Sequence, residues 1–266
     1  MKPPSVMPGA RNWSNDAAQE DGVRLAILTS IAMLAFAANS VLARLALSEG
    51  GIDPLAYTGI RLVSGAIVLA TIMQLRSRKA GANKPAAMGR SMGGTWSGAL
   101  ALLLYAATFS IAYVMIATAP GALILFASVQ IGMLAWAVIN GDRPAPLEWI
   151  GIAVAFGALV YLVSPGLVAP PLTGTVLMAI AGVSWGGYCL VGRGSQSPLA
   201  DSAGNFMRCM PAGVLLVLVG IFRLKPEFEG VVYALLSGAV ASGLGYIIWY
   251  SALPSLSRTR AAFVQL

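Results

Sequence analysis

The chain of 266 residues contains no histidine and only two cysteines, and just 10% of its residues are charged. Without histidine there is neither a His-ligated metal nor a Ser-His catalytic pair. A typical soluble domain has about 25% charged residues, so this chain has too few to cover a soluble surface. These absences argue against a soluble enzyme, a nucleic-acid-binding domain and a disordered protein. We expect no nucleic-acid partner.

Two further absences narrow the chemistry. The sequence has no G-x-x-x-x-G-K-[ST] loop, which argues against an ATP-driven pump. Two cysteines are too few for a disulfide framework, and Cys189 and Cys209 both lie in apolar segments. We therefore expect them to be ordinary core residues, and we expect neither a metal nor a cofactor.

Long apolar runs dominate what is present. Hydrophobic residues make up 58% of the chain, and the mean hydropathy is +0.78. A membrane-spanning helix needs about 20 apolar residues, so the length accommodates roughly eight to ten spans. A polar tail is expected over 1–23. The expected helices are 25–47, 54–75, 95–117, from the Pro120-Gly121 break to 139, 147–163, 172–191, 202–222 and 230–253, and 261–266 begins a ninth.

Basic residues are distributed unevenly between the expected loops. If the N-terminus is cytoplasmic, twelve Lys and Arg fall in segments on the cytoplasmic side and three on the other side. Cytoplasmic loops of membrane proteins carry an excess of Lys and Arg. The asymmetry therefore predicts a multi-pass protein in contact with the lipid bilayer, with its N-terminus in the cytoplasm.

Three stretches of the first part recur in the same order in the second, and one of these matches aligns Arg61 with Arg208. An odd number of helices per repeat inverts the second repeat in the membrane, as in many secondary transporters. We predict an all-α polytopic membrane helix bundle with an inverted repeat of five transmembrane helices. The first repeat covers 24–164 and the second 172–266. Ten helices are expected, with eight and part of a ninth present, and the full chain would end at about residue 303 in this plan.

Several stretches resemble a known family: FAANSVLARLAL followed by IDPLAYTGIRLVSGAIVL, then NGDRPAPLEWIGIAVAFGALVYLV, and YIIWYSALPSLSRTRAAFVQL. Together they resemble EamA-like members of the drug/metabolite transporter superfamily, although Asp142 stands where the family usually has Glu. The resemblance implies a secondary transporter, an exporter or exchanger of small metabolites or amphipathic compounds. It also implies alternating access in a bacterial inner membrane.

Two arginines fall inside expected spans. Arg61 lies seven residues after Pro54, which places it about 10 Å into the membrane, and Arg208 lies seven residues after Asp201. Charged side chains at such depth usually face a cavity, a partner or backbone carbonyls. Both guanidiniums are candidates to line a central pathway and to favour anionic substrates. The alternative is that each reaches the headgroups or caps a neighbouring helix end.

Aromatic and polar residues gather on three of the expected helices. Asn39, Trp185, Tyr188 and Tyr246 are candidates for a central substrate site, because Asn39 and Tyr188 align within the repeat and aromatic rings suit amphipathic metabolites. The alternative is helix packing or an aromatic belt at the membrane surface. Trp249 and Tyr250, near a helix end, favour the belt.

Acidic residues occur only at helix ends or in loops, and we expect Asp53 and Asp201 to be helix N-caps. Gly182-x-x-x-Gly186 and Gly238-x-x-x-Ser242 are expected to allow close helix packing within the bundle, with a homodimer as the alternative. A membrane-embedded lipid-modifying enzyme and a non-transporting structural bundle remain rival functions. No acid/base cluster suits the enzyme, so we predict that the protein is not an enzyme.

Overall fold

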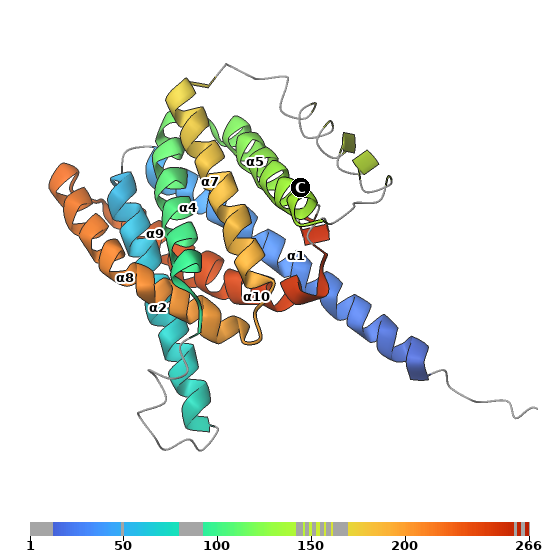
Figure 1. Cartoon of the computed structure of the whole chain (residues 1–266). Coiled ribbons are helices and arrows are strands. Elements are labelled where there is room, and N and C mark those ends of the chain that lie inside the picture. Colours follow the sequence, from blue (N-terminus) through green and yellow to red (C-terminus); the bar gives the residue numbers. More distant parts are fainter. Residues whose placement is uncertain are drawn as a thin grey trace, which may run out of the picture.

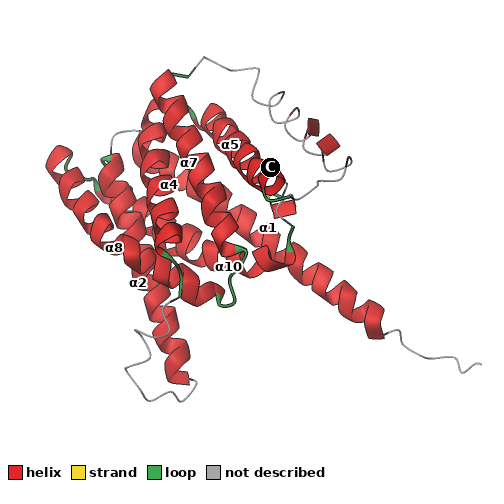
Figure 2. Ribbon diagram, in the orientation of Figure 1, coloured by secondary structure: helices red, strands yellow, loops and turns green. Residues whose placement is uncertain are grey.

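The computed structural model describes residues 13–48, 51–79, 93–141 and 170–257, together with scattered positions in 142–169 and 258–265. Helices make up every regular element in these parts, and no strand occurs in them (Figure 2). Seven of the helices are long and apolar enough to cross a membrane. The prediction of an all-α multi-span protein is therefore confirmed. The expected helix 147–163 lies mostly outside the described residues, and the ten-helix inverted repeat stays a prediction.

Six long helices precede the last described span. The first six described spans are α1 (Trp13–Ser48), α2 (Pro54–Lys79), α4 (Trp96–Met115), α5 (Thr118–Ile139), α7 (Leu172–Gly192) and α8 (Pro198–Arg223). The seventh span, Phe228–Ser255, is divided into α9 (Phe228–Leu236), the π-helix η2 (Ser237–Leu244), α10 (Gly245–Ala252) and the 3₁₀ turn η3 (Leu253–Ser255).

Three helix starts differ from expectation, and one of them is α8, which begins at Pro198 and not at residue 202. Helix α1 begins at Trp13, so the second half of the expected polar tail 1–23 is helical. Pro120 does not break the chain but lies in the first turn of α5, where a proline is tolerated because the amide there has no helical partner. Pro54 does begin α2, as predicted.

The helices form a single bundle in which α2 is central (Figure 1). Helix α2 packs against α8, α9 and η2, while α4 packs against α7 and α8, and α1 packs against α9, η2 and α10. The start of α1 and the end of α2 extend beyond the other helices (Figure 1). Segments far apart in the sequence therefore meet around the middle of α2.

The π-helix η2 lets the last span approach α2 closely. Its sequence, SGAVASGL, consists mostly of small residues, and a Cβ added to Gly238 would collide with the backbone of Arg61 and the hydroxyl of Ser64. The expected packing role of Gly238 within the bundle is thus confirmed. π-Turns are rare and are often found at functional sites.

Candidate functional site

Arg61 is the centre of a buried polar cluster. Its side chain is 1% exposed, and it extends from α2 towards three other elements. Nε donates to Ser242 Oγ of η2 at 2.8 Å. Nη2 donates to Tyr246 OH of α10 at 2.6 Å and to Tyr105 OH of α4 at 3.3 Å. One guanidinium therefore joins the second helix to a neighbouring helix and to the last described span.

The charge of Arg61 is surrounded by neutral groups. Its guanidinium carbon lies 5.2 Å from the ring centroid of Tyr105 and 5.5 Å from that of Phe109, within the range of cation–π attraction. Across the parts of the chain that the structure describes, the one ion pair joins Arg223 and Asp53. Nη1 of Arg61 is buried and has no hydrogen-bond partner. Hydroxyls and aromatic rings thus surround this cation, and no carboxylate of the described residues pairs with it.

Aromatic side chains from both ends of the sequence meet beside Arg61. The ring centroid of Trp185 lies 5.1 Å from that of Phe36, 5.0 Å from that of Tyr105 and 4.7 Å from that of Tyr246. Tyr188 stacks on the same indole at 5.5 Å. The indole nitrogen also has a partner, since it donates to Oε1 of Gln265 at 2.6 Å. This arrangement offers planar, mostly apolar surfaces next to a positive charge.

Asn39 closes the cluster on the side of α1. Ser237 Oγ donates to Asn39 Oδ1 at 2.6 Å, and Asn39 Nδ2 donates to Tyr105 OH at 3.4 Å. Tyr105 OH consequently links Asn39 to Arg61. Ser237 and Ser242 lie five residues apart in a π-helix, whose i to i+5 hydrogen bonds bring such pairs near one another. Both serines thereby reach the same cluster.

The sequence analysis missed Tyr105, Ser237 and Ser242 as site residues. A signal for Tyr105 is present in the sequence: 112–126 resembles 252–266 at an offset of 140 residues, and the same offset places Tyr105 within one residue of Tyr246. Ser242 had been assigned only a packing role. An α-helical interpretation of this stretch would have placed Ser237 and Ser242 on different faces, so periodicity could not have found the pair.

Arg208 lies outside this cluster. Its Nη1 donates to the carbonyl oxygen of Gly93 at 2.8 Å, and its guanidinium lies 5.8 Å from the ring centroid of Trp96. The side chain is half-buried and binds the segment that precedes α4. The structure thus brings Asn39, Arg61, Trp185, Tyr188 and Tyr246 together, and it gives Arg208 the alternative role of binding a neighbouring helix end.

The aromatic belt expected at Trp249 and Tyr250 is wrong. Both side chains are buried. Trp249 Nε1 donates to Cys189 Sγ at 3.2 Å, and Tyr250 OH donates to the carbonyl oxygen of Tyr188 at 3.1 Å. These rings face the bundle interior because α10 is covered by α1, η2 and α8. Cys189 itself is buried and free, as predicted for a core cysteine.

The two acids expected as N-caps differ in their contacts. Asp53 Oδ1 accepts a hydrogen bond from the amide of Leu55 at 2.8 Å, which confirms its role at the start of α2. Asp201 lies in the first turn of α8 and instead accepts from the amide of Gly94 at 2.7 Å and from Ser195 Oγ at 2.5 Å. Among the described residues, no three Cys, Asp or Glu side chains gather as a metal site requires.

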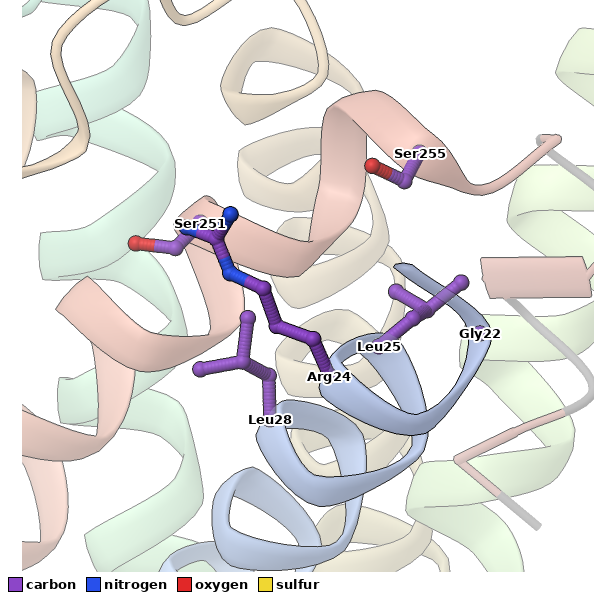
Figure 3. Close-up of a pocket in the computed structure, with 6 residues that line it drawn as sticks. All are labelled: Gly22, Arg24, Leu25, Leu28, Ser251 and Ser255. Atoms are coloured by element: carbon purple, nitrogen blue, oxygen red, sulfur yellow. The ribbon is translucent and has the colours of Figure 1, made fainter. Parts of the chain in front are cut away.

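A separate pocket of about 350 Å³ lies between α1 and the end of the last span. Arg24 extends from α1 past Leu28 towards Ser251 (Figure 3). The apolar part of α1 begins at Gly22, so this pocket lies where that span starts. None of the predicted site residues lines it. The lining residues are Gly22, Arg24, Leu25, Leu28, Ser251 and Ser255.

Comparisons with known proteins give the fold and the family. The chain is 47% identical over 243 residues to the uncharacterized protein PA1977 of Pseudomonas aeruginosa, covering 91% of this chain and 82% of that protein. It is 24% identical over 168 residues to the uncharacterized inner membrane transporter YedA of Escherichia coli, covering 63% of this chain and 53% of that protein. A crystal structure superposes with a TM-score of 0.66 at 18% identity, covering 90% of this chain and 83% of that one, so it shares the fold.

The model of the EamA-like transporter family matches residues 172–266. This match includes Trp185, Tyr188 and Tyr246, three residues of the cluster around Arg61. With the seven apolar helices, it describes a multi-pass membrane protein. The chain belongs to the EamA-like transporter family, within the drug/metabolite transporter superfamily.

Proposed function

We propose that the protein is a secondary transporter, an exporter or exchanger, of small metabolites or amphipathic compounds across the cytoplasmic membrane. The observation that supports this most is the position of Arg61, a buried cation whose hydrogen bonds lead from α2 to Ser242 and Tyr246 of the last described span. An ionisable residue within a membrane segment usually belongs to a substrate or ion pathway. Asn39, Arg61, Trp185, Tyr188 and Tyr246, with Tyr105, form the proposed substrate site.

We propose an inverted repeat as the basis of alternating access. Residues 24–164 form one five-helix unit and 172–266 belong to the second, and the N-terminus is cytoplasmic. Arg61 and Tyr105 then come from the first unit, and Ser242 and Tyr246 from the second. Rocking of one unit against the other would break the hydrogen bonds from Arg61 to the second unit and open the cluster to one side of the membrane.

Arg208 has a different part in this proposal. It holds the segment before α4, in the first unit, to α8 of the second unit without touching the substrate. The lipid-modifying enzyme is disfavoured because the cluster has phenols, hydroxyls and a guanidinium but no general base of the usual carboxylate or imidazole type.

A flux experiment in proteoliposomes tests the proposed function. The purified chain is reconstituted and loaded with amino acids, nucleosides, aromatic carboxylates or amphipathic amines, and counterflow of the labelled compound is measured without an ion gradient. We expect saturable counterflow of at least one compound. Modification of the vesicle lipids with no flux of any compound would support the enzyme and contradict the proposal.

A further inference from the structure

We infer that the substrate of this site carries an anionic group, such as a carboxylate, on an aromatic body and carries no ammonium group. The inference rests on the proposed function and specifies its substrate class. Arg61 binds the anion in this assignment, while the rings of Phe36, Trp185 and Tyr246 enclose the aromatic body.

The anionic group is inferred from the incomplete set of hydrogen-bond partners around the Arg61 guanidinium. A buried cation without a counter-charge is costly, and truncating one partner of a buried pair typically destabilises a protein by several kcal/mol. Arg61 is 1% exposed, its hydrogen-bond partners are neutral hydroxyls, and Nη1 has no hydrogen-bond partner. Nη1 is the open arm of the planar guanidinium fork, since both N–H groups of Nη2 already donate to Tyr105 and Tyr246. A bound carboxylate would supply the missing acceptor and the missing negative charge together.

The aromatic body is inferred from the rings that adjoin the guanidinium. Phe36 meets Trp185 edge-on with an interplanar angle of 86°, and it meets Tyr246 at 76°. The rings of Trp185 and Tyr246 are buried in the described structure, so a planar group of the substrate would pack against them in the same edge-to-face geometry only once the cluster opens. Polar atoms of Asn39, Tyr105 and Tyr246 lie near these rings at the end where Arg61 lies, and the amide of Gln265 binds the indole nitrogen of Trp185. One end of the cluster therefore suits an anion and the other an apolar ring.

An ammonium group is disfavoured for two reasons. Aromatic rings also bind organic cations, but here Arg61 already places a positive charge among them, and like charges at close range repel in a low dielectric. None of the ten acidic residues lies in the middle of a long apolar run of the sequence. The carboxylate of Asp53 accepts a hydrogen bond at the start of α2, and that of Asp201 accepts hydrogen bonds from Gly94 and Ser195. A zwitterion would therefore gain binding free energy at its carboxylate and lose binding free energy at its ammonium group.

Four compounds with the same ring test the inference. Binding of 3-phenylpropanoate, its neutral amide, phenylalanine and phenethylamine is measured by competition with a labelled sample of the anion on the purified chain. We expect the anion to bind about tenfold more tightly than the amide or phenylalanine, which is the effect of one charge-assisted hydrogen bond. We expect phenethylamine to bind most weakly.

Two matched variants assign the effect to Arg61. The preference for the anion over the amide should fall to near unity in Arg61→Gln and persist in Arg208→Gln, since Arg208 lies outside the cluster. If Arg61→Gln does not fold, Arg61→Lys keeps the charge and loses the fork, and a reduced preference is expected. Equal binding of anion and amide by the original chain, or an unchanged preference in the Arg61 variants, overturns the inference.

The counterflow results distinguish a failure of this inference from a failure of the proposed function. Counterflow of phenethylamine, phenylalanine or a nucleoside, without counterflow of 3-phenylpropanoate, leaves a transporter whose substrate is not an aromatic anion. Absence of counterflow for every compound contradicts the proposed function itself. Tight binding of the anion without counterflow supports the anion site and counts against transport.

Discussion

Arg61 and Arg208 occupy corresponding positions in the proposed repeat but have different surroundings. Arg61 is fully buried, and its guanidinium contacts hydroxyls and rings from three other elements of the bundle. Arg208 is half-buried, and its guanidinium binds one backbone carbonyl ahead of α4. The comparison teaches that an arginine within a span is a candidate for function only once its partners are known.

Small residues cause the difference between the two arginines. Gly238 in η2 brings Ser242 and Tyr246 towards Arg61, because any Cβ at Gly238 would collide with the backbone of α2. Gly204, one turn before Arg208, admits the carbonyl of Gly93 in the same way. In each case a glycine allows another segment to approach the arginine. Arg61 thereby meets a cluster of side chains, and Arg208 meets the segment before a helix.

The largest expected effect comes from removing the charge at Arg61. Arg61→Gln should lower the rate of transport about 100-fold, the equivalent of two charge-assisted hydrogen bonds at about 1.5 kcal/mol each. Arg208→Gln should change it about twofold or less, because its partner is a backbone carbonyl outside the cluster. Initial rates in proteoliposomes, normalised to inserted protein, measure both. Equal losses of transport rate in the two variants would contradict the difference between Arg61 and Arg208.

Removing one hydroxyl from the cluster should have a smaller effect. Tyr246→Phe deletes the 2.6 Å hydrogen bond from Arg61 and keeps the ring, so we expect about a tenfold loss of transport. Tyr250→Phe is the matched control, since its hydroxyl binds the backbone of Tyr188 away from Arg61. A loss of transport in Tyr250→Phe as large as that in Tyr246→Phe would argue that the cluster acts only through packing.

A methyl group at Gly204 tests the structural role of Arg208, because Gly204 lies against Gly93, the residue whose carbonyl Arg208 binds. The added Cβ would collide with the carbonyl of Gly93, so Gly204→Ala should reduce the free energy of unfolding by about 1–3 kcal/mol. Gly187→Ala, with nothing within 4 Å of the added Cβ, should be neutral or slightly stabilising. Thermal unfolding in detergent compares the pair, and an equal melting temperature for both would be inconsistent with close packing at Gly204.

The smallest effect is expected at Arg24. This arginine lines the pocket at the start of the apolar part of α1, apart from the cluster. Arg24→Gln should leave substrate affinity and transport rate unchanged within about twofold, because a surface charge usually contributes little. The same flux assay measures it. A loss comparable with that of Arg61→Gln would mean that the substrate pathway includes this pocket.

Much of the fold followed from the sequence. Apolar runs of spanning length gave seven helices that the structure contains, and Pro54 marked the start of α2 because proline suits that position. The first helix was predicted too short: residues 13–23 are polar, and a hydropathy argument detects only the apolar part of a longer helix. The π-helix was missed because its residues are apolar or small and carry no distinct period.

The candidate site was only partly predictable. Repeat matching and the rarity of buried charge pointed to Arg61, Asn39 and Tyr188, which the structure brings into one cluster. The partner of Arg208 was not predictable, since Gly93 lies 115 residues away and backbone carbonyls have no sequence signature. Distant pairs of this kind depend on tertiary packing, which a single sequence does not specify.

The cluster's exposure to each side of the membrane in turn is the central claim, and Ser242→Cys tests it most directly. Ser242 is buried and bonded to Arg61, while the natural cysteines Cys189 and Cys209 are buried, so the original chain provides the unlabelled control. A membrane-impermeant thiol reagent is applied to oriented vesicles from the outside and, separately, from the inside. The account predicts labelling of Ser242→Cys from both sides, slowed by bound substrate. Labelling from neither side, in folded protein that still transports, would contradict it.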